Sequence, residues 1–218
     1  MCKIILVGNN NVGKSSIISK YVENDISENI LNTFSNDKFK KIIKIKDEKI
    51  ELDIWDTVGQ ENYRSVNTIF MRNAEIAILV YDITNRKSFE DLEFWYNQVI
   101  KTINDTIVVL AIAANKSDLY EEQVVDFEEG KEFAKKKSID IIRETTSFDF
   151  ENINNFFEEI LLEYIEKKDS NDNQNENNIN NFNDENDNKN EKNSFSLIKP
   201  LNNENNQNYK PDPLCEFA

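Results

Sequence analysis

Histidine is absent from this chain of 218 residues, and cysteine, glycine and proline are scarce. Without histidine, the protein cannot build a histidine-based triad, a histidine general base or a histidine metal site. The two cysteines, Cys2 and Cys215, stand near opposite ends of the sequence and have no metal-site spacing. This cysteine usage favours a reduced, intracellular protein.

Long apolar runs are also missing. The longest one, residues 107–114, has the length of a strand and is too short to span a membrane. The sequence leads from Met1 directly into the first predicted strand, so we expect no signal peptide. Acidic residues outnumber basic ones, and the formal net charge is −15. A field of that sign opposes nonspecific binding to nucleic acid, and we expect no nucleic-acid partner.

The four glycines are therefore informative, and two of them bound one motif. Residues 8–15 read G-x-x-x-x-G-K-S, the pattern of a phosphate-binding P-loop. The apolar run 3–7 before the motif predicts a buried strand, and helical spacing of apolar residues follows it. An ordinary strand-turn-helix is the alternative explanation of this octet.

In a P-loop, backbone N–H groups at the start of a helix converge on phosphate, where the helix dipole favours negative charge. Lys14 would reach the β- and γ-phosphates, and the Ser15 hydroxyl would coordinate Mg²⁺. The candidate phosphate-binding residues are Asn11, Val12, Gly13, Lys14, Ser15 and Ser16.

A second motif, D-T-V-G-Q at residues 56–60, follows the predicted strand 49–55. Asp56 is placed to act in the second sphere of Mg²⁺. The backbone N–H of Gly59 can approach a γ-phosphate because no side chain blocks it. Gln60 carries a donor and an acceptor, so it could orient a water for in-line attack. Without the P-loop, this stretch would be interpreted as a plain turn.

Two further motifs predict a pocket for a base. The first is the stretch Asn115-Lys116-Ser117-Asp118, which follows the buried run. The carboxylate of Asp118 could accept two hydrogen bonds from the adjacent donors of guanine, which adenine lacks. The stem of Lys116 could lie along the base, and Asn115 could tie loops together. Residues 144–147 follow the last predicted strand, and the backbone at Thr146 and Ser147 would complete the pocket. Alone, each of these motifs is a weak signal.

Periodicity predicts a three-layer α/β domain with a six-stranded, mostly parallel sheet and helices on both faces. The expected strands are 3–7, 38–46, 49–55, 76–81, 107–113 and 139–142. The expected helices are 14–23, 64–73, 87–103, 127–137 and 151–167. Strands 38–46 and 49–55 should form an antiparallel hairpin at the sheet edge.

The domain should cover residues 1–168. Residues 169–218 form an Asn-rich, acidic tail that contains all three prolines and few apolar side chains. Such a segment cannot bury enough surface to offset the entropy of ordering, so we expect the tail to be disordered.

Together these motifs resemble the small GTPases of the Ras superfamily and, more narrowly, the Rab branch. The Rab-like stretches are LDIWDT at 52–57, YRSV at 63–66 and LVYDIT at 79–84. The resemblance implies a P-loop GTPase fold and a GTP/GDP switch in vesicle traffic, with Mg²⁺ as cofactor. It implies that Thr33 belongs to switch I and senses Mg²⁺ and the γ-phosphate.

In that scheme Gln60, Lys14 and Thr33 carry the catalysis, and Ser15, Thr33 and Asp56 form the metal site. Hydrolysis would be slow until an activating protein binds. The two switches, which are the segments around Thr33 and from Gly59 to about Arg72, would also contact an exchange factor and effectors.

Several positions depart from the family pattern. Switch I continues from Thr33 as FSNDK, and Val58 replaces an alanine. The aromatic residue that normally packs beside guanine is Ile26 here, which predicts weaker binding and faster release of the nucleotide. The family's Ser-Ala-Lys is Thr146-Ser147-Phe148, which has no lysine. Asn11 replaces a glycine, but asparagine tolerates a left-handed backbone, so the loop should still close.

The last four residues, Cys215-Glu216-Phe217-Ala218, fit a C-a-a-X prenylation signal except that Glu216 is not aliphatic. The acidic tail lacks a polybasic second signal. Lipidation would therefore give reversible residence of a cytoplasmic protein on the cytosolic face of an endomembrane. An unmodified thiol is the alternative.

Two other functions remain open at this point. The altered switch I and Val58 favour a GTP-binding scaffold with little or no hydrolysis. An adenine-nucleotide enzyme such as a kinase is a third interpretation, which conflicts with Asp118.

Overall fold

The computed structural model describes residues 1–23, 38–46, 48–56, 70–103, 109–139 and 141–190. At residues 103 and 171–190 this description covers the backbone alone. The chain divides into two units, Met1–Asp172 and Asn173–Ala218. The first unit contains the sheet and all the predicted site residues that the structure describes.

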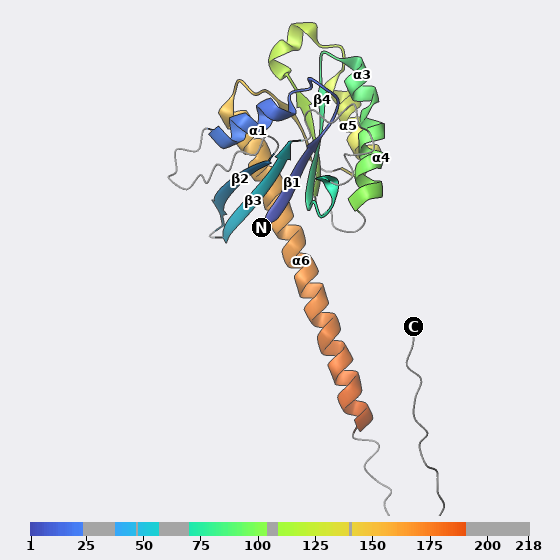
Figure 1. Cartoon of the computed structure of the whole chain (residues 1–218). Helices are drawn as coiled ribbons and strands as arrows, with labels where there is room; N and C mark the ends of the chain where they lie inside the picture. The colour runs from blue at the N-terminus through green and yellow to red at the C-terminus, as the bar shows by residue number, and fades with distance from the viewer. Residues whose placement is uncertain (24–37, 47, 57–69, 104–108, 140, 191–218) are drawn as a thin grey trace, which may run out of the picture. The chain divides into compact units, whose positions relative to one another are not determined.

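A six-stranded sheet forms the centre of the first unit (Figure 1). Its strands are β1 (Cys2–Val7), β2 (Lys38–Ile45), β3 (Glu48–Asp56), β4 (Ile76–Asp82), β5 (Val109–Asn115) and β6 (Ile141–Thr145). The spatial order is β2-β3-β1-β4-β5-β6. The pair β2–β3 is antiparallel and every other neighbouring pair is parallel, which confirms the predicted sheet and its edge hairpin.

The central strands are buried because helices cover both of their faces. Every residue of β4 is buried, and all but one residue of β5 are. Both strands are continuous apolar runs, the pattern expected of parallel strands covered on two sides. In contrast, β2 lies at the edge of the sheet and is mostly half-exposed.

The helices are α1 (Lys14–Glu23), α3 (Arg86–Glu90), α4 (Leu92–Ile103), α5 (Phe127–Lys136) and α6 (Phe150–Asn190), and η2 (Ser117–Glu122) is a 3₁₀ helix. The predicted helix 87–103 is interrupted at Asp91, whose N–H still bonds to Lys87 O. Most of the predicted helix 64–73 lies outside the described residues; of its described residues, 70–73, Phe70 and Met71 are helical.

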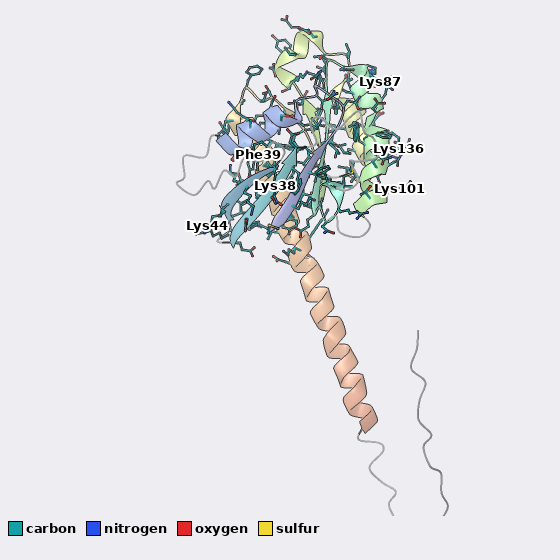
Figure 2. All side chains as sticks on the ribbon, viewed as in Figure 1. Lys38, Phe39, Lys44, Lys87, Lys101 and Lys136 are labelled. Atoms are coloured by element: carbon teal, nitrogen blue, oxygen red, sulfur yellow. The ribbon has the colours of Figure 1, made fainter. Side chains whose placement is uncertain are left out.

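Each face of the sheet has its own apolar layer. Residues of α1 and α6 pack on one face, where the rings of Tyr21 and Phe157 stack at 3.8 Å between centroids. Residues of α4 and α5 pack on the other face. Lys87, Lys101 and Lys136 are exposed and lie on the outer side of the helices over this second face (Figure 2).

The last helix is longer than predicted. It continues past Lys168, where we expect a disordered tail to begin, as far as Asn190. Residues 150–190 contain neither glycine nor proline, so no residue in this stretch interrupts the backbone hydrogen bonds. The rest of the tail, 191–218, lies outside the described residues, and its disorder stays a prediction. None of the described helices is both long enough and apolar enough to cross a membrane.

Candidate nucleotide-binding site

The carboxyl ends of the parallel strands bring the predicted motifs to one edge of the sheet. Asp56, the last residue of β3, pairs in register with Leu6 of β1, directly before the P-loop. On the other side, Asn115 at the end of β5 pairs with Asp82 of β4 and with Thr145 of β6. Ligands of open α/β sheets bind at this edge, where the strand order reverses.

The backbone of the P-loop requires its two glycines. Gly8 has φ +155°, and a Cβ there would lie 2.2 Å from the carbonyl oxygen of Val80. Gly13 has φ +97°, and its Cβ would lie 2.2 Å from Asn115 Nδ2. No side chain fits at either position. Asn11 has φ 60°, the left-handed conformation that we predicted asparagine would adopt here.

Lys14, the first residue of α1, lies beneath this loop. Its side chain is buried, and Nζ donates hydrogen bonds to Gly8 O at 2.9 Å and to Asn9 O at 2.8 Å. These carbonyls hold the ammonium group under the loop that would wrap a phosphate chain. Ser15 is half-exposed and Ser16 is exposed in the same turn. The helix N-terminus therefore presents a cation and a hydroxyl together, as a phosphate site requires.

Asn115 joins the P-loop to the base side of the site. Its Nδ2 donates to Val12 O at 2.7 Å, and its Oδ1 accepts from Thr145 Oγ1 at 3.1 Å. All three residues are buried. One amide thus links three elements that are far apart in the sequence, which is the role we predicted for this side chain.

The two base motifs also meet. Thr146 Oγ1 donates to Asp118 Oδ1 at 2.6 Å, and Asp118 is exposed to solvent. The backbone N–H of Thr146 donates to Asn152 Oδ1 at 3.0 Å, and Asn152 Nδ2 donates to Glu144 O at 3.1 Å. These bonds fix the loop after β6 against the start of α6. Ser147, beside Thr146, is half-exposed.

Lys116 has a left-handed backbone, with φ 67°. Its Nζ forms an ion pair with Asp82 Oδ2 at 2.6 Å, and the other oxygen of Asp82 accepts hydrogen bonds from the N–H and hydroxyl of Thr84. The carboxylate of Asp82 anchors the end of the Lys116 side chain, so the aliphatic stem is held where it could line a base.

Trp95 and Asp91, which belong to the Rab-like stretches of the sequence, also hold the P-loop through a contact that the sequence did not predict. Trp95 Nε1 donates to Asn9 Oδ1 at 2.7 Å, and Asn9 Nδ2 donates to Asp91 Oδ2 at 2.8 Å. The helix interruption at Asp91 lies at this contact. No motif signals the arrangement, although Trp95 is one of only two tryptophans in the chain.

Comparison with known proteins agrees with this geometry. A sequence model of the Ras family matches residues 3–166. Ras-related protein Rab-17 of Mus musculus is 36% identical over 165 residues, which cover 76% of each chain. Ras-related protein RABA1c of Arabidopsis thaliana is 35% identical over 159 residues, 73% of each chain. GTP-binding protein ypt4 of Schizosaccharomyces pombe is 36% identical over 165 residues, covering 74% of this chain and 70% of its own.

The chain belongs to the Ras family. Within that family it is a Rab-like small GTPase of vesicle traffic. Guanine-nucleotide binding and GTPase activity are general properties of this family.

Two residues of the predicted metal site of this Rab-like GTPase, Ser15 and Asp56, lie in the described part of the chain. Asp56 is buried, with 8% of its surface exposed, and it ends the strand beside β1. Among the described residues no three acidic or cysteine side chains cluster as a metal site would. A Mg²⁺ site built from a P-loop hydroxyl and substrate phosphates needs no such cluster. Ser15 and Asp56 fit this donor chemistry, since both offer oxygen ligands.

The remaining predicted site residues lie outside the described part of the chain. They are Thr33, Gly59 and Gln60, together with Ile26, Val58 and the lipidation candidate Cys215. Their roles therefore stay predictions from the sequence of this Rab-like GTPase.

Proposed function

We propose that this Rab-like GTPase cycles between GTP and GDP forms by slow hydrolysis of GTP, with an activating protein accelerating the reaction. The observation that best supports the proposal is the position of Asn115, which joins the P-loop to the base loops through bonds of 2.7 and 3.1 Å. A single nucleotide that binds both regions would find them already held at a fixed spacing.

Each described residue then has a task. The ammonium group of Lys14 would turn from the carbonyls of Gly8 and Asn9 to the β- and γ-phosphates. The carboxylate of Asp118 would accept the hydrogen bonds that select guanine, while the hydroxyl of Thr146 holds that carboxylate through its Oδ1. Backbone donors at Gly13 and its neighbours would surround the phosphates without interference from side chains.

The hydrolytic step needs residues on both sides of the γ-phosphate. Ser15 and Thr33 would hold Mg²⁺, with Asp56 in support; when bound, the ion neutralises charge that develops on the phosphates. Gln60 would orient the attacking water through its amide, and the N–H of Gly59 would contact the γ-phosphate. The roles of Thr33, Gly59 and Gln60 rest on the sequence motifs.

The pairing of two arginines supports the expectation that a partner stimulates hydrolysis. In the described part of the chain, Arg86 is paired with Glu129 and Arg143 is paired with Glu159. Neither is offered to a phosphate group. An activating protein would have to supply the missing transition-state charge, and the unaided rate should be on the order of 10⁻⁴ to 10⁻³ per second.

Single-turnover hydrolysis tests the proposal. We expect the purified protein to hydrolyse bound GTP slowly and a Gln60→Leu variant to lose this activity, with nucleotide release measured in parallel so that dissociation is not mistaken for turnover. Tight GTP binding with equally negligible hydrolysis in both proteins, and no rescue of the wild type by an activating protein, would instead establish the scaffold function. Preference for ATP in a competition assay would contradict both.

Membrane association is the second part of the proposal. Prenylation of Cys215 would place the protein reversibly on the cytosolic face of an endomembrane, where exchange factors and effectors could reach its switches. The mass of the C-terminal peptide, isolated from cells that make the protein, tests this step. An unmodified thiol in the membrane-bound fraction would contradict it.

A further inference from the structure

The side-chain amide of Asn9, in the P-loop, is bound at both of its polar atoms by residues from the junction of α3 and α4. Its Oδ1 accepts a hydrogen bond from Trp95 Nε1 at 2.7 Å, and its Nδ2 donates to Asp91 Oδ2 at 2.8 Å. These partners lie 86 and 82 residues later in the chain. We call this pair of hydrogen bonds the Asn9 clamp. Because the oxygen and the nitrogen of the amide both have a partner, the clamp fixes the orientation of the side chain.

The backbone of the same residue holds the lysine of the P-loop. The carbonyl oxygen of Asn9 accepts from Lys14 Nζ at 2.8 Å, and Gly8 O accepts from the same ammonium group at 2.9 Å. Lys14 is only 2% exposed, so its ammonium group is held by protein groups rather than by water. A chain of hydrogen bonds therefore leads from α4 through Asn9 to the cation that would meet the phosphates.

The two anchors of the clamp are themselves fixed. Trp95 is 6% exposed and belongs to the apolar layer in which α4 packs on the sheet. The carboxylate of Asp91 is held by its other oxygen, since Oδ1 pairs at 2.8 Å with Nζ of Lys87, which lies on the outer side of these helices (Figure 2). Neighbours that are locked by packing and by their own bonds hold a binding group in one geometry.

A loop that is held in place before the nucleotide arrives loses little further freedom on binding, which favours affinity. The clamp acts on the phosphate side of the site, because its only route described above leads to Lys14. The base side is tied to the P-loop at another point, where Asn115 Nδ2 donates to Val12 O. Loss of the clamp should therefore weaken the contact of Lys14 with the phosphates more than the contact of Asp118 with the base.

We propose that Trp95 and Asp91 are positioning residues for phosphate binding, which act through Asn9 to place the ammonium group of Lys14. The inference rests on the proposed function, because it requires the phosphates of a guanine nucleotide to bind at Lys14. It adds a task for the start of α4, which contributes to nucleotide affinity without touching the nucleotide.

Affinities of the full-length protein for GDP and GMP test the inference. GMP lacks the β-phosphate that Lys14 would bind. Trp95→Phe keeps a buried aromatic ring but has no indole N–H, so it should bind GDP about five- to tenfold more weakly than the wild type, the loss expected for one hydrogen bond. Its affinity for GMP should stay that of the wild type. A general loss of packing would weaken the binding of both nucleotides equally.

A double-variant cycle shows whether Trp95 acts through Asn9. Asn9→Ala removes both hydrogen bonds of the clamp, so it should weaken GDP binding by itself. In that background Trp95→Phe should cause no further loss, because its partner is already absent. Losses that multiply would mean that the indole acts independently of Asn9, and they would overturn the inference.

Asp91 offers a conservative variant, and its side chain is only 26% exposed and not part of the apolar layer, so the fold tolerates its replacement better than that of Trp95. Asp91→Asn keeps an oxygen that can accept from Asn9 Nδ2, whereas Asp91→Ala has none. We expect Asp91→Ala to bind GDP about five- to tenfold more weakly and Asp91→Asn to bind it as the wild type does. Equal losses in the two variants would trace the effect to the negative charge and would overturn the role of Asp91.

The ³¹P resonance of the β-phosphate in bound GDP gives a spectroscopic signature of the ammonium group. It should shift in Trp95→Phe, while the resonance of the α-phosphate keeps its position. Tyr96, the next residue of α4, provides the matched control, since its ring lies 4.7 Å from Lys137 Nζ. Tyr96→Phe also removes one polar atom from an aromatic side chain and should change neither the β-phosphate resonance nor the affinity for GDP.

The outcomes separate the inference from the proposed function. Wild-type GDP affinity in Trp95→Phe, or an equal loss of GDP and GMP affinity, would overturn the inference and leave the proposed function intact. An unshifted β-phosphate resonance, or the same shift in Tyr96→Phe, would also overturn the inference. A wild-type protein that binds no guanine nucleotide would overturn the proposed function and the inference together.

Discussion

Asn115 Nδ2 lies 2.7 Å from the carbonyl oxygen of Val12, so the end of β5 is bonded to the middle of the P-loop. The same amide nitrogen occupies the space that a Cβ at Gly13 would need. The two observations describe one tight junction between the phosphate side and the base side of the site. Because the amide of Asn115 fills the space beside Gly13, the junction requires glycine at position 13 and asparagine at position 115 together.

Replacing Asn115 by alanine should damage binding and stability at once. Val12 O and the Thr145 hydroxyl would both lose their partner while buried, and each such loss costs about 1–3 kcal/mol. If about 1.4 kcal/mol of this loss appears in nucleotide binding, GDP release should become about tenfold faster. Stopped-flow release and urea unfolding measure the two effects.

The matched control for this change is Asn97→Ala. Asn97 is exposed on α4, and its amide donates to Glu93 at 3.3 Å. Removing it should change the free energy of unfolding by less than about 0.5 kcal/mol and leave GDP release unchanged. If Asn115→Ala behaved like Asn97→Ala, the junction would have no energetic role.

The P-loop offers a paired test at Gly13 and Asn11. Gly13→Ala places a methyl group at a position where φ is +97° and Asn115 Nδ2 is 2.2 Å away, so tight GDP binding should be lost. The unfolding free energy should fall by about 1–2 kcal/mol. Asn11 also has positive φ, 60°, but its side chain is exposed, and glycine adopts this conformation without strain.

Asn11→Gly should therefore bind GDP as the wild type does, with a change in stability below about 1 kcal/mol. Isothermal titration with GDP and urea unfolding distinguish the two variants. A Gly13→Ala protein that binds GDP normally would show that the loop shifts freely, contrary to the close approach at Asn115.

The sequence predicts the core of this fold well because its signals are local. The apolar runs at β4 and β5 could only be buried strands, and the spacing after Lys14 matches α1 residue for residue. The P-loop glycines could also be predicted, because a left-handed backbone or the close approach of another atom favours glycine. The motif also predicts that Asn115 ties loops together, although it does not say that one of them is the P-loop.

Contacts between distant residues could not be predicted in the same way. Nothing near Asn9 in the sequence indicates that its amide meets Trp95 and Asp91, because this contact depends on how α4 packs against the sheet. The extent of α6 also differs from the prediction, which rests on the scarcity of apolar side chains after residue 168. Without glycine or proline, a helix that is already anchored by packing can continue through polar residues.

The thiol of Cys2 provides a prediction that is independent of the nucleotide. Cys2 is 1% exposed in β1, and burial, with a further contribution from the negative charge of Glu75, raises the pKa of its thiol from 9.0 to about 12. In the folded protein the thiol therefore stays neutral near pH 8. In a Cys215→Ser variant, where Cys2 is the only thiol, an aromatic disulfide reagent should react only after unfolding in urea.

The same shift predicts how stability depends on alkaline pH. Above pH 9 the unfolded state loses the Cys2 proton while the folded state keeps it, so the free energy of unfolding should fall between pH 9 and about 12. The slope that Cys2 contributes cannot exceed about 1.4 kcal/mol per pH unit. Urea unfolding from pH 8 to 11 should show a steeper decline for Cys215→Ser than for the double variant with Cys2→Ala. Burial also raises the pKa of Tyr81 and of Tyr164, and Cys2 contributes to the shift of Tyr164, so the difference between the two slopes measures Cys2 together with its interaction with Tyr164. Equal slopes, or a native thiol that reacts at pH 8, would show that Cys2 is not held neutral by the core.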